Sequence, residues 1–161
     1  LGVVLIDVGK GALAAWLGLR FGPAHGLFAT HAPAQALAYA TAFAATLGHV
    51  WPLWHGFRGG KGVGTLLGGL LMLWPTAVPW LLLVWLLVLV TSGYVGMASV
   101  IAVACVVPLA WFAGAEADNA RRLFSCAGAL LVLFTHRGNL QRLRAGSESR
   151  FERIRLLRKR T

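Results

Sequence analysis

Acidic residues are scarce in this chain of 161 residues, which has five Asp and Glu against fifteen Lys and Arg. No charged residue lies between Arg20 and Arg58 or between Lys61 and Glu116, and 58% of the residues are hydrophobic. A water-soluble core does not need uncharged stretches of this length, whereas several crossings of a lipid bilayer do. The sequence therefore predicts an all-α, polytopic integral membrane helix bundle.

Cysteines are also rare, and both Cys105 and Cys126 fall in apolar segments without neighbouring metal ligands. We expect them to pack, and we expect no metal site. Nine of the fifteen Lys and Arg lie after His136, where the last apolar segment ends. Such a distribution fits anionic lipid headgroups and topology control, so we expect membrane lipids as partners, with no nucleic acid and no obligate protein partner.

Six apolar segments, separated by turn residues, account for the hydrophobic runs and predict six transmembrane helices. They cover residues 1–20, 34–53, 62–73, 76–90, 94–112 and 123–135. The last segment becomes longer if residues 119–122 join it. Gly60, Gly64 and Gly68 recur every four residues, which predicts a packing stripe on one face of the third helix.

Positive charge is unequal between alternate loops. If the start of the first segment, the loop around Lys61 and the tail after His136 share one side, that side holds twelve cations against three on the other. The positive-inside rule makes the richer side cytoplasmic. The same parity brings the turn at Thr91 and Ser92 to that face.

The basic tail, residues 147–161, carries its own helix signal. Ser149 and Glu152 have the spacing of a capping box, and apolar residues three apart follow among arginines. This pattern is typical of a helix that lies on the inner leaflet. We therefore expect a transmembrane domain at 1–146 and an interfacial tail at 147–161.

A glycine-rich loop interrupts the apolar part of the chain. Five glycines lie from Gly56 to Gly64, together with Arg58 and Lys61. Glycines let backbone N–H groups approach an anion and the cations add charge, so the loop fits a phosphate cradle. It is neither a P-loop, since Gly62 follows Lys61, nor a dinucleotide fingerprint. A cationic loop that anchors helices at a membrane surface is an open alternative.

Two further polar groups are expected on the same membrane face. Asp7 and Lys10 stand three apart, so a helix puts them on one side, either as a functional pair or as a neutralised pair near the headgroups. After the last segment, His136 fits a base or hydrogen-bond donor, Asn139 an orienting amide and Arg142 a second phosphate contact. A capped helix end explains the same residues without chemistry.

Three ordered stretches share residues and spacing with the motifs of a known family. They are residues 48–65, from Gly48-His49 to Gly64-Thr65; Asp7-Val8-Gly9-Lys10-Gly11; and His136-x-x-Asn139-Leu140-x-Arg142-Leu143-x-x-Gly146-x-Glu148. These stretches resemble the motifs of the bacterial acyl-phosphate-dependent glycerol-3-phosphate acyltransferases, the PlsY family. Together they extend over nearly the whole chain.

The resemblance implies a seven-helix fold in the bacterial inner membrane, with its motifs and C-terminus on the cytoplasmic side. The six segments here would be helices two to seven. The family's first helix and the loop after it, with a substrate-contacting Ser and Arg, have no counterpart in this sequence. The implied reaction transfers an acyl group from acyl phosphate to the 1-hydroxyl of glycerol 3-phosphate, giving lysophosphatidate and phosphate, without a cofactor.

The resemblance also implies roles for individual residues. They are substrate binding by His49, Arg58, Gly59, Gly60, Lys61, Gly62 and Arg142; catalysis or orientation by Lys10, Ser99, His136 and Asn139; and structural support by Asp7, Gly146 and Glu148. The N–H groups of Gly59, Gly60 and Gly62 would face the phosphate. Lys10 would add positive charge or brace Asp7. The family often has serines at both Gly96 and Ser99, of which one remains here.

Two other function classes fit the residues when the resemblance is set aside. A small transporter or channel would use Asp7 and Lys10 to line a pore and would give flux in vesicles. A scaffold would depend on the basic tail and would tolerate changes at Lys61. The three motifs favour the enzyme over both.

Overall fold

The computed structural model describes residues 2–21, 34–112 and 119–151, and every regular element in these ranges is helical. The elements are α1 (Gly2–Phe21), α2 (Ala34–Val50), the short 3₁₀ helix η1 (Leu53–His55), α3 (Val63–Leu73), α4 (Ala77–Ser92), α5 (Val95–Phe112), α6 (Asn119–Thr135) and α7 (Arg137–Arg144). The six predicted segments match α1 to α6, and residues 119–122 do join α6. The predicted helical class is confirmed.

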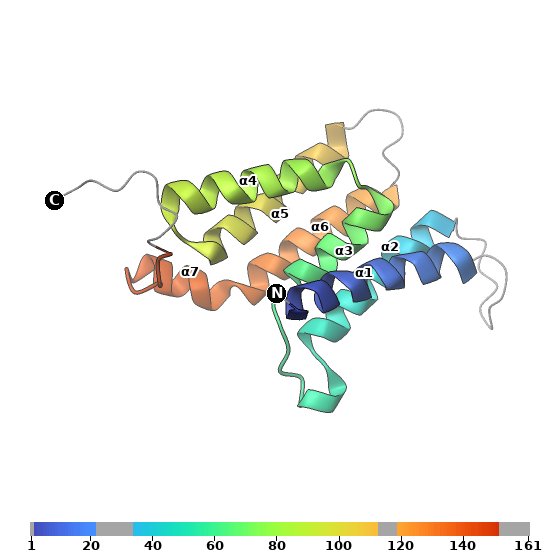
Figure 1. Cartoon of the computed structure of the whole chain (residues 1–161), viewed down its shortest axis with the longest axis horizontal. Coiled ribbons are helices and arrows are strands. Elements are labelled where there is room, and N and C mark those ends of the chain that lie inside the picture. The colour runs from blue at the N-terminus through green and yellow to red at the C-terminus, as the bar shows by residue number, and fades with distance from the viewer. Residues whose placement is uncertain (1, 22–33, 113–118, 152–161) are drawn as a thin grey trace.

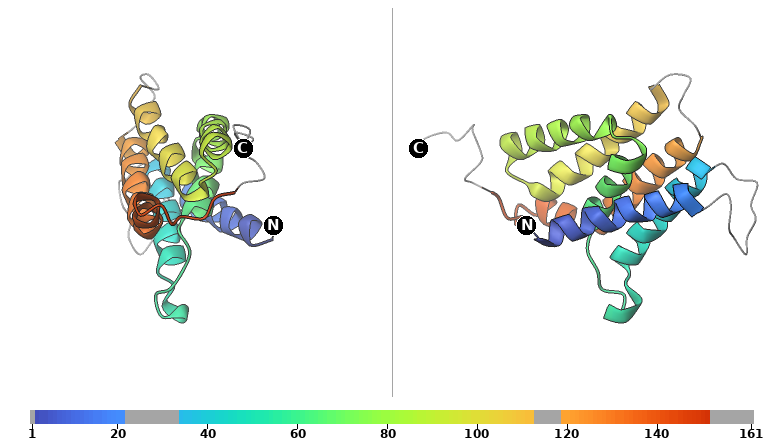
Figure 2. Two further views of the ribbon diagram at one scale, coloured as in Figure 1. Left: turned by 90° about the vertical axis from the view of Figure 1, so that its left-hand side faces the viewer. Right: turned by 45° about the vertical axis from the view of Figure 1, so that its right-hand side comes forward.

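The helices form two groups that α6 connects (Figure 1). α1 packs on α2 and α3, α4 packs on α5, and α6 contacts both α2 and α5. α7 follows α6 at one end of the bundle and contacts α5. The segment between α2 and α3, which contains η1, projects from the bundle in both views of Figure 2.

The helices differ in how far they reach. α1 and α5 have 20 and 18 residues and are apolar enough to cross a membrane. At 1.5 Å per residue they span about 30 and 27 Å, close to the ~30 Å hydrocarbon core of a bilayer. α3 is apolar but has 11 residues, so it reaches about 16 Å, roughly half of that thickness.

The start of α3 differs from the expected one. Gly62 has φ of +85°, a left-handed conformation that a right-handed helix does not contain, so the helix begins at Val63. Gly60 therefore lies in the loop before the helix. The prediction of three glycines on one helix face is wrong at Gly60, and the stripe consists of Gly64 and Gly68.

The C-terminal segment also departs from its predicted conformation. Ser149 was expected to begin a helix, but Arg150 and Phe151 are not helical. The reason is a hydrogen bond across the structure, because the Phe151 N–H donates to the Gly93 carbonyl at 2.8 Å. The rest of the predicted interfacial helix, at 152–161, lies outside the described residues.

α1 and α3 touch through glycines. A Cβ atom on Gly68 would stand 2.0 Å from the carbonyl oxygen of Val8, and one on Gly11 would stand 2.0 Å from that of Thr65. No side chain fits at either position, so the two backbones lie in direct contact. This small-residue packing is common between helices in membranes.

Large apolar side chains also cover the outside of the bundle. On α4, Trp80 is 58% exposed, and Leu82, Leu83, Leu86 and Leu87 are exposed as well. In water a continuous surface of this kind would drive aggregation. A lipid environment satisfies it, because acyl chains are as apolar as leucine.

We expect Gly68→Ala to destabilise the bundle by about 1–3 kcal/mol, because its methyl group meets a backbone carbonyl that cannot move aside. The measurement is the unfolding temperature of the purified protein in detergent. Gly9→Ala on α1 is the matched control, since a Cβ there meets nothing within 4 Å and alanine favours the helix. Equal unfolding temperatures for the two variants would contradict the close contact.

Candidate active site

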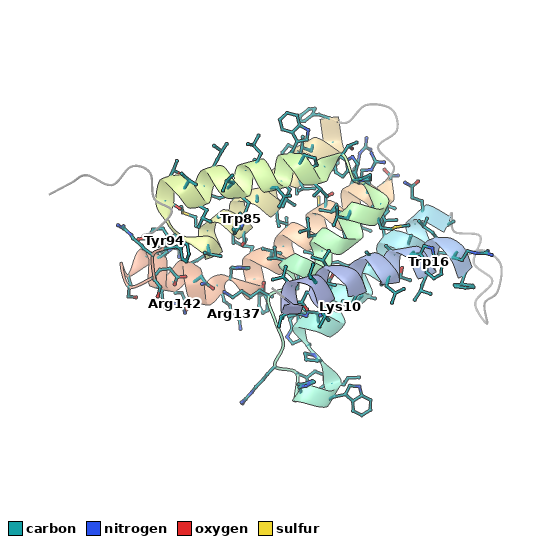
Figure 3. All side chains as sticks on the ribbon, viewed as in Figure 1. Lys10, Trp16, Trp85, Tyr94, Arg137 and Arg142 are labelled. Carbon is teal, nitrogen blue, oxygen red and sulfur yellow. The ribbon has the colours of Figure 1, made fainter. Side chains whose placement is uncertain are left out.

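A cavity of about 730 Å³ opens at the end of the bundle where α7 lies. Its lining comes from six parts of the chain: Val3 and Asp7; His49; residues 60–64; Val95, Gly96 and Ser99; His136 and Asn139; and residues 148–151. Tyr94 and Arg142 mark this end in Figure 3, and Trp16 lies toward the other end. The polar segments that were expected to share one membrane face therefore meet at one cavity.

The glycine-rich loop closes on the end of α2. The N–H of Gly59 donates to the Val50 carbonyl at 3.1 Å, and the N–H of Gly60 donates to the His49 carbonyl at 3.2 Å. A Cβ on Gly59 would stand 2.0 Å from the His49 carbonyl oxygen. The two N–H groups are therefore used within the protein, and they do not form the expected phosphate cradle.

The N-terminus of α3 offers N–H groups in their place. Leu66 is the first donor along the helix to have a backbone partner, with its N–H on the Gly62 carbonyl at 2.9 Å. The N–H groups of Val63 and Gly64 precede it and lack helical acceptors, and both residues line the cavity. The positive end of the helix dipole lies at the same place. The favourable position for an anion is therefore this helix end.

A chain of hydrogen bonds orients the ammonium group of Lys61 in the cavity. Lys61 Nζ donates to Asn139 Oδ1 at 2.8 Å, and Asn139 Nδ2 donates to Glu148 Oε1 at 2.6 Å. Glu148 Oε2 accepts from Arg142 Nε at 2.7 Å. Thr135 Oγ1 donates to the Lys61 carbonyl at 3.0 Å. Asn139 thus orients Lys61, and Glu148 orients Asn139.

A tight reversal after α7 brings Glu148 back to this chain of bonds. The Ser147 N–H donates to the Arg142 carbonyl at 2.9 Å, and the Gly146 N–H donates to the Leu143 carbonyl at 3.1 Å. This pattern is a Schellman motif, which needs a left-handed residue directly after the helix. Gly146 provides it, with φ of +69°.

His136 lies between α6 and α7 with 2% of its surface exposed. Its Nδ1 lies 2.8 Å from the Val132 carbonyl oxygen, which can only accept, so Nδ1 carries the proton. In the neutral ring Nε2 is then the acceptor. Burial lowers the pKa of His136 below 6.5 and the Lys61 charge acts in the same direction, against the Val132 bond and the Glu148 charge.

Glu148 remains a carboxylate. The Asn139 hydrogen bond lowers its pKa most, and the hydrogen bond and charge of Arg142 and the charge of Lys61 add to this, against partial burial. An ionised carboxylate accepts hydrogen bonds on both oxygens, which matches its two donors.

Asp7, Lys10 and His49 form a second polar cluster on the opposite wall. Lys10 Nζ lies 2.6 Å from Asp7 Oδ1 and also contacts His49 Nδ1, which lies 3.4 Å from the same carboxylate oxygen. A Cβ on Gly60 would stand 2.1 Å from His49 Nε2, so the ring packs on the loop. Within the described ranges, no group of three His, Cys, Asp or Glu is placed to hold a metal.

Ser99 has both of its hydrogen-bonding functions occupied. Its hydroxyl donates to the Val95 carbonyl at 3.0 Å and accepts from Trp85 Nε1 at 3.2 Å. One turn earlier, Gly96 packs on the amide group that holds Lys61, because a Cβ there would stand 3.1 Å from three atoms of the Asn139 side chain. Ser99 therefore contributes to the wall, and Gly96 makes room for Asn139.

Comparisons with known proteins cover almost the whole chain. The family model described as "Glycerol-3-phosphate acyltransferase" matches residues 1–146. The glycerol-3-phosphate acyltransferase of Syntrophomonas wolfei is 37% identical over 144 residues, which cover 89% of this chain and 67% of that protein. The one from Synechococcus sp. strain CC9902 is 40% identical over 149 residues, with 92% and 68% covered. The chain belongs to the glycerol-3-phosphate acyltransferase family.

Crystal structures of PlsY (YgiH), an integral membrane glycerol 3-phosphate acyltransferase, share the fold. The glycerol 3-phosphate form matches with a TM-score of 0.79 and 30% identity, covering 92% of this chain and 69% of that one. The lysophosphatidic acid form gives 0.78 and 29%, covering 92% and 70%. The PlsY resemblance is confirmed, and the chain is an integral membrane acyltransferase.

Most of the site residues expected in this acyltransferase lie at the cavity. Those that line it are Asp7, His49, Gly60, Lys61, Gly62, Ser99, His136, Asn139 and Glu148. Lys10 and Arg142 contact members of this group, and Gly146 shapes the reversal. Arg58 and Gly59 do not line the cavity. The assignment of Arg58 as a substrate-binding residue stays a prediction, whereas the N–H contact expected from Gly59 is taken by the Val50 carbonyl.

Sequence reasoning missed several lining residues. They are Val3, Val63, Gly64, Val95, Gly96, Ser149, Arg150 and Phe151. For Gly96 the available signal was its position one turn before Ser99. Arg150 had no distinguishing signal, since it is one of nine cations after His136.

We expect the acid limb of the pH profile of kcat/KM to have its midpoint below pH 6.5, the ordinary pKa of histidine. A lowered pKa keeps His136 neutral as the pH falls, and Nε2 stops accepting protons below that lowered value. The measurement is the initial rate at low substrate concentration across pH 5 to 8. His136→Asn is the control that separates this ionisation from that of the substrate, and a midpoint above 6.5 would contradict the assignment.

Proposed function

We propose that this chain transfers an acyl group from acyl phosphate to the 1-hydroxyl of glycerol 3-phosphate, giving lysophosphatidate and inorganic phosphate. The supporting observation is the cavity in which Lys61, the N-terminus of α3 and His136, whose Nδ1 is bound to Val132, converge. PlsY, whose fold is the same, has been solved in glycerol 3-phosphate and lysophosphatidic acid forms. The chain would thus use an acceptor and give a product of those classes.

The acceptor phosphate would bind at Lys61 and the start of α3. Lys61 supplies a full charge, and the N–H groups of Val63 and Gly64 supply donors at the positive end of a helix dipole. Gly62 turns the chain so that these groups face the cavity. Arg58 does not line the cavity, so in place of the direct phosphate contact expected from the sequence it would draw anions toward the site as an exposed cation.

His136 would act on the acceptor hydroxyl. As the hydroxyl oxygen attacks the acyl carbon, His136 Nε2 accepts its proton and the new ester C–O bond forms. The bond between the acyl carbon and the phosphate oxygen breaks, and phosphate leaves with the electron pair. Because the pKa of His136 is lowered, the proton passes on readily to the departing phosphate. Asn139 contributes by holding Lys61.

The transfer would be direct, without an acyl-enzyme. A serine nucleophile needs a base that takes its proton, whereas the Ser99 hydroxyl donates to the Val95 carbonyl. Acyl phosphate is already activated, so positioning and charge stabilisation are the main requirements. Ser99 then shapes the wall of the donor site through Trp85.

The remaining residues would support these groups. Asp7 and Lys10 hold His49 against Gly60, and Arg142 holds Glu148. The Asp7–Lys10 pair was the basis of the transporter alternative. Because Asp7 lies on the wall of the same cavity, acyl transfer accounts for the pair without a pore.

The membrane arrangement follows the distribution of charge. We assign residues 1–146 to the membrane domain and 147–161 to a basic tail, with the cavity and the tail on the cytoplasmic side of a bacterial inner membrane. The support is the excess of cations at that end, twelve against three. A cytoplasmic site would also give direct access to water-soluble glycerol 3-phosphate.

Replacing Lys61 by Met should raise the KM for glycerol 3-phosphate about 10- to 100-fold, because a hydrogen bond to a charged group contributes about 1.5–3 kcal/mol. The assay is steady-state kinetics of the full-length protein in detergent micelles. Arg144→Met, an exposed cation outside the cavity, is the charge-matched control. An unchanged KM in Lys61→Met would remove Lys61 from the phosphate site.

The donor assignment is tested with membranes that hold the full-length protein. Given glycerol 3-phosphate and long-chain acyl phosphate, they should form lysophosphatidate and release one phosphate per product. Acyl-CoA and acyl carrier protein, offered in separate reactions, should give no product above that of membranes without the protein. Product from either of these, and none from acyl phosphate, would overturn the assignment.

A further inference from the structure

The segment after α7 forms a wall of the cavity, although the family model ends before it. The match covers residues 1–146, whereas residues 148–151 line the cavity. In Figure 1 this segment passes from α7 toward the end of α4. The Phe151 N–H donates to the Gly93 carbonyl at 2.8 Å, which ties the segment to the turn between α4 and α5.

Arg150 belongs to this segment, and Tyr94, which lies between α4 and α5, holds its side chain. Its Nε donates to the Tyr94 hydroxyl, and its guanidinium carbon lies 4.9 Å from the centre of the Tyr94 ring. Guanidinium has five N–H donors, and among the described residues Nε is the one with a partner. The group is therefore oriented at the cavity with donors to spare, in a geometry that suits phosphate.

The two proposed substrates each carry a phosphate, so the cavity must bind two anions. Among its described lining residues, the cations other than histidine are Lys61 and Arg150. Lys61 is tied to Asn139 beside the start of α3, where the acceptor phosphate is placed. Arg150, which is held by Tyr94 and is not part of the Lys61–Asn139 chain of hydrogen bonds, remains for the second anion.

The cavity that Arg150 lines also has apolar side chains that suit a lipid-like molecule. Phe151 is 47% exposed, Val95 is 48% exposed and Val3 is 72% exposed, and all three line the cavity. The wall near Lys61 is polar by contrast, with Asn139 and His136. An acyl chain would lie along the apolar side chains while its phosphate stays at the guanidinium.

We propose that Arg150 binds the phosphate of the acyl donor and that Tyr94 is its positioning residue. The assignment rests on the proposed function, since it needs a donor that carries a phosphate. It leaves the acceptor phosphate to Lys61 and divides the cavity between the two substrates.

The test compares Arg150→Gln with the wild-type full-length protein in micelles without anionic lipid, using long-chain acyl phosphate and glycerol 3-phosphate. The KM for acyl phosphate should rise about 10- to 100-fold, as expected for the loss of a charged hydrogen bond, while the KM for glycerol 3-phosphate changes less than about threefold. Arg144→Gln on α7 is the matched control and should change neither value.

Two further variants test the details of the contact. Arg150→Lys keeps the charge without the planar fork and should recover part of the donor affinity. Tyr94→Phe should raise the KM for the donor and leave the KM for glycerol 3-phosphate unchanged. The double variant Tyr94→Phe with Arg150→Gln should have the same donor KM as Arg150→Gln, because Tyr94 acts through Arg150.

Three results would overturn the proposal. An unchanged donor KM in Arg150→Gln would exclude the contact, and equal increases in both KM values would indicate a structural role. An effect that appears only when anionic lipid is added would assign Arg150 to a lipid headgroup instead. If the wild-type protein makes no product from acyl phosphate, the proposed function fails before Arg150 is tested.

Discussion

The direct contact between the backbones of α1 and α3 is the constraint on which the site depends. α3 is short and apolar, so it has few side chains that could fix its position along the membrane normal. Gly11 and Gly68 remove the side chains that would separate the two helices. The contact places the start of α3 beside Asp7, where a Cβ on Gly64 would stand 3.0 Å from the Asp7 Cβ. The anion-binding helix end and the Asp7 cluster therefore form one wall.

The opposite wall is held mainly by side-chain hydrogen bonds. Lys61 crosses between the walls, with its carbonyl bound by Thr135 and its ammonium bound by Asn139. These polar contacts involve groups that water can also reach, so they can exchange partners when a substrate enters. The cavity thus combines one wall built on backbone contact with one built on side-chain hydrogen bonds.

The sequence predicted the helices and the main polar groups because both leave strong local patterns. Uncharged runs and turn residues located six helices, and the motif spacing located Lys61, His136 and Asn139. What failed depends on competition between distant groups. The N–H groups of Gly59 and Gly60 are occupied because they donate to carbonyls at the end of α2. Spacing alone contains no information on such competitors.

The other differences have similar causes. The left-handed conformation of Gly62 cuts the expected glycine stripe, and a single backbone bond from Phe151 to Gly93 prevents the helix that a capping pattern indicated. Arg150 could not be singled out among the nine Lys and Arg that follow His136. In the tail, a contact with a remote part of the chain overrode local propensity.

The reversal at Gly146 has a consequence for how the acyltransferase unit is delimited. The family model ends at this glycine, yet the carboxylate that completes the Asn139 amide follows two residues later. A fusion protein joined directly after Gly146 would keep all the helices among the described residues and lose this acceptor. The Asn139 amide could then flip about its side-chain bond, and its oxygen would no longer be fixed toward the ammonium of Lys61. The residues that the active site needs therefore extend beyond the end of the family match at Gly146.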